Sequence, residues 1–165
     1  MNPFSADGYV VRDASPDDVE ALVSLINEAY IVEQFFVTGP RISAADILAL
    51  MENGIVLLGT VPGSEIVGSV YIEPRGDRGY IGLLSVSPGL QGQGIGRWLM
   101  RSAEERLGAS GCSVADIRVV SLRTELPPFY EKLGYVHQGT EPFEDSRKTR
   151  ACHFLKMSKD LGIRT

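Results

Sequence analysis

Residues 85–100 read SVSPGLQGQGIGRWLM, and the other elements of the chain are organised around this stretch. An apolar, strand-like segment, residues 80–86, leads into it. Glycine then occupies positions 92, 94 and 96, and a helix-like run begins at Arg97. Glycine lets a backbone approach a ligand closely, and the first N–H groups of a helix have no partner within it. Because the helix dipole also favours an anion there, this strand, loop and helix predict a phosphate-binding site.

Two other phosphate-binding motifs fit this loop less well. A P-loop requires a Gly-Lys pair, and none occurs in the chain. A dinucleotide fingerprint, Gly-x-Gly-x-x-Gly, would need its third glycine at Arg97 or at Leu99. Asp116 lies where that motif expects its ribose-binding acid, but it sits inside an apolar run rather than at a strand end. The dinucleotide interpretation and a plain glycine turn stay as the weaker alternatives.

A second motif gives the glycine loop its context. The loop contains Gln91, Gly94 and Gly96 in the spacing Gln-x-x-Gly-x-Gly, after the turn Val-Ser-Pro at residues 86–88. Residues 128–135 read PFYEKLGY. Together these resemble the GNAT superfamily of N-acetyltransferases, which carry Arg/Gln-x-x-Gly-x-Gly/Ala and, roughly 35 residues later, Phe-Tyr-x-Lys-x-Gly-Phe. The specific motifs span residues 80–135, and the order of elements resembles the family over nearly the whole chain.

Composition limits the classes of protein that this chain can represent. The 165 residues predict one domain spanning residues 1–165, with 44% apolar and 22% charged residues. The net charge is −5 and no basic block occurs, so no nucleic-acid partner is expected. Cys112 and Cys152 are far apart and predict neither a disulfide framework nor a metal site. Residues 1–8 do not resemble a signal peptide and no apolar run has the length of a membrane span, so we expect a cytoplasmic protein.

The pattern of apolar residues predicts an α/β fold with three layers. We expect strands at residues 9–12, 55–61, 65–73, 80–86, 114–120, 135–139 and 152–157, with helices at 15–32, 43–54, 95–107 and 125–133. Turns are predicted at residues 62–63 and 74–79, and a polar, turn-like segment at 141–150. Strict alternation would place Val67 on the same face of its strand as Tyr71. The resemblance implies the acyl-CoA N-acyltransferase fold: a mixed, mostly antiparallel sheet of about seven strands that splays open at its middle.

The same resemblance implies acetyl-CoA as cosubstrate and no metal. The pyrophosphate would lie on the backbone N–H groups of residues 91–96, and the pantetheine amides would pair with the edge of the central strand. The N–H group of Val86 would stabilise the oxyanion formed at the thioester carbonyl. The predicted cofactor-binding residues are Leu84, Ser85, Val86, Gln91, Gly92, Gln93, Gly94, Ile95, Gly96, Arg97, Arg123, Phe129 and Lys132.

Tyr130 is the first candidate for a catalytic residue. In many family members the tyrosine of this motif protonates the departing thiolate, although a tyrosine that only packs against pantetheine is the alternative. Many members also carry a glutamate base at the start of the central strand, and here that position is Tyr80. Glu73, at the end of the neighbouring strand, is the predicted substitute, and His137 and His153 are further candidates.

The acceptor is predicted to be a small-molecule or peptide amine. In the family, the region between the first two helices commonly forms the acceptor wall, which here points to Tyr30, Phe35 and Phe36 as substrate-binding residues. The alternative for the two phenylalanines is a place in the core. Dimers are common in the family, so a homodimer is a further expectation. A non-catalytic CoA-binding sensor or interaction domain is the alternative function, because the usual glutamate is missing.

Overall fold

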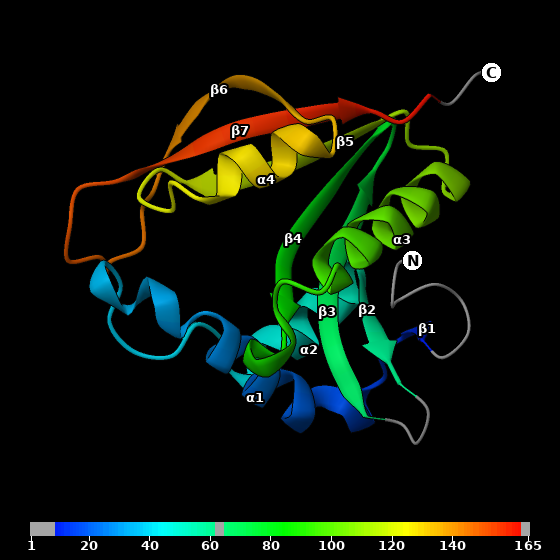
Figure 1. The fold of residues 1–165 in the computed structure, drawn as a ribbon, viewed down its shortest axis with the longest axis horizontal. Helices are drawn as coiled ribbons and strands as arrows, with labels where there is room; N and C mark the ends of the chain where they lie inside the picture. Colours follow the sequence, from blue (N-terminus) through cyan, green and yellow to red (C-terminus); the bar gives the residue numbers. More distant parts are fainter. Residues whose placement is uncertain (1–8, 62–64, 163–165) are drawn as a thin grey trace.

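A computed structural model describes residues 9–61 and 65–162 of the chain (Figure 1). These residues form a seven-stranded sheet in the order β1-β2-β3-β4-β5-β7-β6. The strands are β1 Val10–Asp13, β2 Ile55–Thr60, β3 Ile66–Arg75, β4 Arg78–Val86, β5 Val114–Val120, β6 Val136–Pro142 and β7 His153–Asp160. Neighbouring strands are antiparallel except β4 and β5, which are parallel, as expected for a helical crossover. The predicted α/β class with a mixed, mostly antiparallel sheet is confirmed.

Helices cover both faces of this sheet, which gives the predicted three layers. Helices α1 (Val19–Ala29) and α2 (Ala44–Asn53) pack on one face, and α3 (Ile95–Ala109) and α4 (Leu126–Lys132) pack on the other. Short 3₁₀ helices precede α1 (η1, Pro16–Asp18), follow it (η2, Ile31–Phe35) and follow β4 (η3, Pro88–Leu90). Within residues 9–61 and 65–162, no helix is both long enough and apolar enough to span a bilayer.

The parallel pair β4 and β5 touches over a short length only. Its register pairs Arg78 with Val114, Gly79 with Ala115 and Tyr80 with Asp116, and no pairing follows beyond Tyr80. In Figure 1 the two strands meet near the end of α3, where the chain enters β5, and then diverge. Residues 81–86 therefore pair with β3 on one side and leave their other edge open. The sheet splays at its middle, as the resemblance implies.

Local sequence signals explain where several helices begin. The Ser43 hydroxyl accepts a hydrogen bond from the Asp46 N–H at 3.2 Å, and the Asp46 carboxylate accepts one from the Ser43 N–H at 2.9 Å. This reciprocal pair is the predicted capping box of α2. Pro127 and Pro128 lie in the first turn of α4, where a missing N–H costs nothing.

The lengths of several elements differ from the prediction. Strand β3 continues to Arg75 and strand β4 begins at Arg78. The turn between them therefore has two residues rather than six. Strands β6 and β7 are both longer than predicted, and β6 takes in the start of the segment predicted as a turn. Helix α1 ends at Ala29 rather than near residue 32, and the chain continues as the 3₁₀ helix η2. The predicted turn at residues 62–63 lies outside the described residues.

A β-bulge corrects the predicted faces of β3. Gly59 pairs with Gly68 and Thr60 pairs with Ile66, so Val67 is an extra residue in the strand. Val67 consequently packs in the core under α3, whereas Tyr71 packs in the core under α1 and α2. The predicted placement of these two side chains on one face was therefore wrong.

Candidate active site

A second bulge shapes the open edge of β4. Ser69 pairs with Ser85 and Tyr71 pairs with Gly82. Between these two pairs, one residue of β3 lies opposite two residues of β4. Leu83 lies inside this bulge with φ 53°, a conformation that a branched side chain rarely adopts. The buried Ser85 hydroxyl donates to the Leu83 carbonyl at 3.0 Å and supports the bulge from within. A strained, internally bonded bulge at this point is typical of a functional site.

The backbone of Val86 faces the open side of the sheet. The next residue, Ser87, donates its N–H to the Val67 carbonyl of β3 at 2.9 Å. Adjacent residues of a strand direct their N–H groups to opposite edges, so the Val86 N–H points away from β3. β5 has already diverged from β4 there. This N–H is therefore available to a ligand.

The glycine loop carries the chain from this edge into α3. Gly92 and Gly94 have φ values of 81° and 91°, which glycine tolerates and other residues resist. Gly94 is the N-cap of α3 and no side chain caps the helix, so its first N–H groups are not satisfied by a cap. A Cβ added at Gly92 would meet no atom within 4 Å, so the loop faces open space. The N-terminus of this 15-residue helix is thus an exposed anion site.

Two cavities meet at Tyr130. A groove of about 1350 Å³ runs along the glycine loop, the end of β4, α1 and the start of α4. A smaller cavity of about 190 Å³ opens between the diverging strands β4 and β5. The residues that line both are Tyr30, Leu84, Leu126 and Tyr130. The groove and the smaller cavity therefore adjoin at these four side chains.

The environment of Tyr130 favours a neutral hydroxyl. Its ring packs edge-on against Phe129, with centroids 5.0 Å apart, and against Tyr135 at 5.9 Å. Burial and, to a smaller extent, the neighbouring Tyr30 hydroxyl raise the pKa of Tyr130 above its ordinary value. Burial likewise raises the pKa of Tyr30 to about 12. Tyr130 therefore stays protonated at neutral pH and can act as an acid but not as a base.

A sequence model of the acetyltransferase (GNAT) domain matches residues 50–137, which hold both the glycine loop and the Tyr130 motif. The chain belongs to the GNAT acetyltransferase family. The predicted resemblance is confirmed.

Solved structures of GNAT acetyltransferases share the fold over nearly the whole chain. The ribosomal-protein-S18-alanine N-acetyltransferase of Escherichia coli is 17% identical, with a TM-score of 0.75, and covers 95% of this chain and 96% of its own. The protein yncA of Salmonella typhimurium, solved with its cofactor acetyl-CoA, is 18% identical, with a TM-score of 0.74 and the same coverage. A phosphinothricin acetyltransferase from Sinorhizobium meliloti, solved with AcCoA, is 17% identical, with a TM-score of 0.75, and covers 93% of this chain and 89% of its own.

Most residues predicted to hold the cofactor of this GNAT chain line the groove. They are Leu84, Val86, Gln91, Gly92, Gly94, Ile95, Gly96, Arg97, Arg123 and Phe129. Ser85 is buried under the bulge and Gln93 does not line the groove. Lys132 lines a separate cavity of about 200 Å³ between α3 and α4, together with Arg97, Arg101 and Lys159. Lys132 therefore lies outside the groove, in a neighbouring cavity that shares Arg97 with it.

Arg123 holds two parts of the groove wall together. Its Nη1 donates to the Glu33 carboxylate of η2 at 2.7 Å, and its Nε donates to Glu125 at 3.3 Å. Both Arg123 and Glu33 are largely buried, with side chains 13% and 11% exposed. Burial raises the pKa of Glu33 although the bond from Arg123 lowers it. Glu33 was not predicted, and the only signal for it was a carboxylate inside the apolar run of residues 31–36.

The predicted acceptor residues separate into three environments. Tyr30 lines both cavities, as an acceptor wall requires. Phe36 is fully buried in a core with Val37, Val120 and Phe143 and lines neither cavity. Phe35 is 44% exposed and packs edge-on against Phe36, and it lines neither cavity. Phe36 is therefore a core residue, which was the alternative prediction for it.

Glu73 lines neither cavity, although its cross-strand neighbour Tyr80 lines the smaller one. Its carboxylate accepts a hydrogen bond from the Tyr71 hydroxyl at 2.7 Å and forms an ion pair with Arg75. The bond from Arg75 keeps the pKa of Glu73 below its ordinary value, which makes it a weak base. His137 pairs with Glu131 on α4 at 3.4 Å, also outside both cavities. The geometry therefore does not support Glu73 or His137 in proton removal.

His153 begins β7 and lines neither cavity. Within the described part of the chain, no three His, Cys, Asp or Glu side chains are grouped so that they could hold a metal ion. The groups that reach the junction of the two cavities are therefore hydroxyls and backbone amides rather than imidazoles.

Proposed function

We propose that this GNAT chain transfers the acetyl group of acetyl-CoA directly to a primary amine. One observation carries the proposal: the open edge of β4 leads from the uncapped start of α3 to Tyr130, where the groove meets the smaller cavity. The groove is large enough for an extended cosubstrate, and the cavity opens where an acceptor would meet its reactive end. Proteins of the same fold have been solved with acetyl-CoA, which supports this choice of cosubstrate.

Each part of the site would bind one part of acetyl-CoA. The N–H groups of residues 91–96 would hold the pyrophosphate, and Arg97 in the first turn of α3 would add positive charge. The backbone of β4 from Leu84 to Val86 would pair with the pantetheine amides as an added strand would. This binding mode needs an unpaired strand edge, which the divergence of β4 and β5 provides.

The chemistry then requires a hydrogen-bond donor for each oxygen or sulfur that gains negative charge. The acceptor nitrogen, in its neutral form, forms a bond to the thioester carbon. The Val86 N–H would donate to the carbonyl oxygen as that oxygen becomes negative. The carbon–sulfur bond breaks with its electron pair on sulfur, and Tyr130 would give its proton to that thiolate. The acceptor nitrogen would lose its proton to water at the open rim of the cavity, and water would return a proton to the Tyr130 phenolate.

A combined binding and turnover experiment tests the proposal. Acetyl-CoA, CoA and NAD are compared in thermal unfolding, and a ligand of the native state adds about 2.7 kcal/mol at a concentration about 100 times its Kd. Acetyl-CoA is then incubated with a panel of primary amines, and free CoA thiol is measured against a control without amine, which corrects for Cys112 and Cys152. We expect stabilisation by acetyl-CoA and amine-dependent release of CoA. Stabilisation by NAD alone would refute the proposal.

Binding without release, across the whole amine panel, would instead support a CoA-binding sensor. The structural observation that favours this second candidate is the absence of a carboxylate base at the start of β4, where Tyr80 stands. Glu73 does not replace that base, because its carboxylate is occupied by Tyr71 and Arg75.

A further inference from the structure

We infer that the acceptor carries a carboxylate as well as its amine, and that Arg41 and Arg118 bind this carboxylate at the rim of the smaller cavity. The inference rests on the proposed function and narrows it to amino acids and similar amino carboxylates. The two arginines come from distant parts of the sequence, the segment before α2 and the middle of β5, and both line this cavity.

The charges that line the cavity are unequally satisfied. The acidic residues are Glu33, Glu144 and Asp145, and the basic residues are Arg41, Arg118 and Arg147. Glu33 is occupied by Arg123 at 2.7 Å, and Asp145 is occupied by Arg147 at 3.0 Å. Arg41 and Glu144 have no ion-pair partner among the described residues, and the one carboxylate near Arg118, that of Glu141 at 3.8 Å, lies closer to Lys156 at 3.5 Å. This residual charge of about one positive unit suits a monoanion such as a carboxylate better than a dianionic phosphate.

Arg41 presents a guanidinium group that no protein carboxylate occupies. Within residues 9–61 and 65–162, no acid lies within ion-pair distance of it. Its guanidinium carbon lies 5.3 Å from the ring centroid of Tyr30, which it covers. Because stacking uses the flat face of the guanidinium, the N–H groups at its edge stay available. Tyr30 also lines the groove, so Arg41 contacts a side chain that would face the cosubstrate.

Arg118, on β5, lines the same cavity and also stacks on aromatic rings. Its nearest carboxylate, that of Glu141, is 3.8 Å away and is shared with Lys156 at 3.5 Å. The guanidinium covers the rings of Tyr80 and Phe154, at 5.4 and 4.6 Å from their centroids. Because the contact with Glu141 is long and shared, N–H groups on the edge of Arg118 can still donate to a ligand carboxylate.

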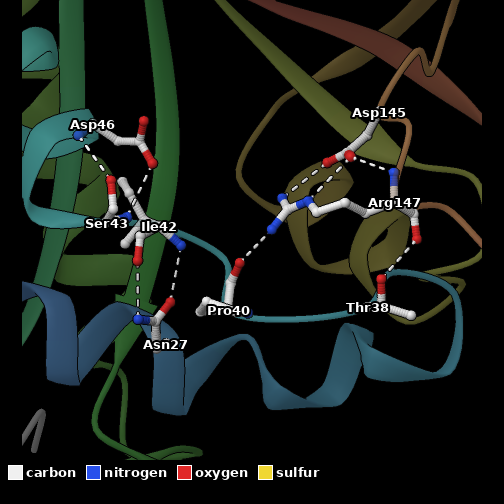
Figure 2. Close-up of polar contacts among 8 residues, drawn as sticks. All are labelled: Asn27, Thr38, Pro40, Ile42, Ser43, Asp46, Asp145 and Arg147. Atoms are coloured by element: carbon white, nitrogen blue, oxygen red, sulfur yellow. Dashed lines mark hydrogen bonds and ion pairs between the residues drawn. The ribbon is translucent and has the colours of Figure 1, made fainter.

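The backbone that carries Arg41 is fixed on both sides (Figure 2). The Pro40 carbonyl accepts a hydrogen bond from Arg147 at 2.5 Å. Ile42 donates its N–H to the Asn27 side chain at 2.9 Å and accepts the Asn27 amide N–H at 3.1 Å. Figure 2 shows that the Asp145 carboxylate holds the Arg147 guanidinium in turn. The ion pair between Arg147 and Asp145 therefore positions Pro40, the residue before Arg41. Holding the segment before a ligand arrives lowers the entropy lost on binding.

The test uses matched acceptors. With acetyl-CoA held constant, the standard amino acids are compared with their carboxamides and with the amines that lack the carboxylate carbon. A charge-assisted hydrogen bond contributes about 1.5–3 kcal/mol, so we expect kcat/KM for the best amino acid to exceed that for its amide at least about tenfold. Arg41→Gln and Arg118→Gln should each raise KM for the acid by a similar factor and leave kcat and the use of the amide nearly unchanged.

Arg150→Gln is the matched control. Arg150 also stacks on an aromatic ring, that of Phe35 at 5.5 Å, but it lines neither cavity, so its loss should not change KM. Acetyl-CoA binding and thermal unfolding of all three variants show whether they are folded. If amides and amines are used as well as acids, or if the Arg41 and Arg118 variants lose both in equal proportion, the inference is wrong while the proposed function stands. Binding of acetyl-CoA without CoA release from any acceptor would overturn both.

Discussion

Replacing Tyr130 by phenylalanine removes one hydroxyl from the junction of the two cavities. The ring contacts with Phe129 and Tyr135 involve only carbon atoms that phenylalanine keeps. Within the described residues the Tyr130 hydroxyl makes no hydrogen bond to protein, so its loss leaves no partner unsatisfied. We therefore expect the free energy of unfolding to change by no more than about 0.5 kcal/mol.

The effect on turnover should be much larger than the effect on stability. A positioned general acid contributes about 100-fold to 10,000-fold to a rate. We expect the lower end, about 100-fold in kcat, because the Val86 N–H stays in place for the oxyanion and the Tyr30 hydroxyl lines both cavities as well. That factor corresponds to about 2.7 kcal/mol of transition-state stabilisation.

Steady-state release of CoA thiol gives kcat, and calorimetric titration with CoA gives Kd, which should change little. Tyr135→Phe is the matched control, because this neighbouring tyrosine donates a 2.8 Å hydrogen bond to Glu104 in the core and lines neither cavity. That variant should lose about 1–2 kcal/mol of unfolding free energy and keep its kcat. An unchanged kcat in Tyr130→Phe, or an equal loss in Tyr135→Phe, would refute the role of Tyr130 as an acid.

Two further predictions concern stability. Gly68→Ala should lower the free energy of unfolding by about 1–3 kcal/mol in urea titrations, because the new Cβ would lie 2.7 Å from Leu99. Gly89→Ala is the control and should be nearly neutral, because its Cβ would meet no atom within 4 Å. Equal effects of the two substitutions would contradict the close packing at Gly68. The hydrogen bond from Arg12 lowers the pKa of Asp18 to about 2, so its stabilising effect is complete above about pH 4 and is lost as the pH falls toward 2. Asp18→Asn should therefore destabilise at neutral pH and converge with wild type in acid, and a constant difference would show that the pair does not titrate as described.

The glycine loop could be predicted from sequence because its signal is local. Gly92 and Gly94 have positive φ, and only glycine adopts such values without strain, so the residue type reports the conformation. The capping box of α2 is local in the same sense, since Ser43 and Asp46 satisfy each other's backbone. Because these signals are short-range, the conformation of the glycine loop and the start of α2 could be predicted from sequence.

The two bulges had no such signal. Leu83 has φ 53° although leucine disfavours it, and Val67 is an ordinary strand residue. Register is decided by pairing across the sheet rather than by the residue itself. The predicted alternation in β3 failed for this reason, and the shape of the open edge of β4 could be anticipated only through the family resemblance.

The walls of the smaller cavity, the proposed acceptor site, depend on contacts between distant segments. Glu33 and Arg123 are 90 residues apart in sequence and meet only because η2 packs near the start of α4. Phe35 and Phe36 are adjacent, yet one is exposed and the other is buried against Phe143. No local pattern in the sequence indicates which of two neighbouring aromatic residues turns inward. The candidate acceptor residues could therefore be predicted only as a group.

The unpaired edge of β4 also has a consequence for solubility. Sheet edges invite other strands to add, and the outer edges of this sheet are blunted: β1 has four residues, and β6 contains a register shift and ends in Pro142. The inner edge from Ile81 to Val86 has no such protection except its recess between α3 and the β5 arm. A cosubstrate that pairs with this edge would therefore also shield it from aggregation, so the yield of soluble protein should follow the cell's supply of that cosubstrate.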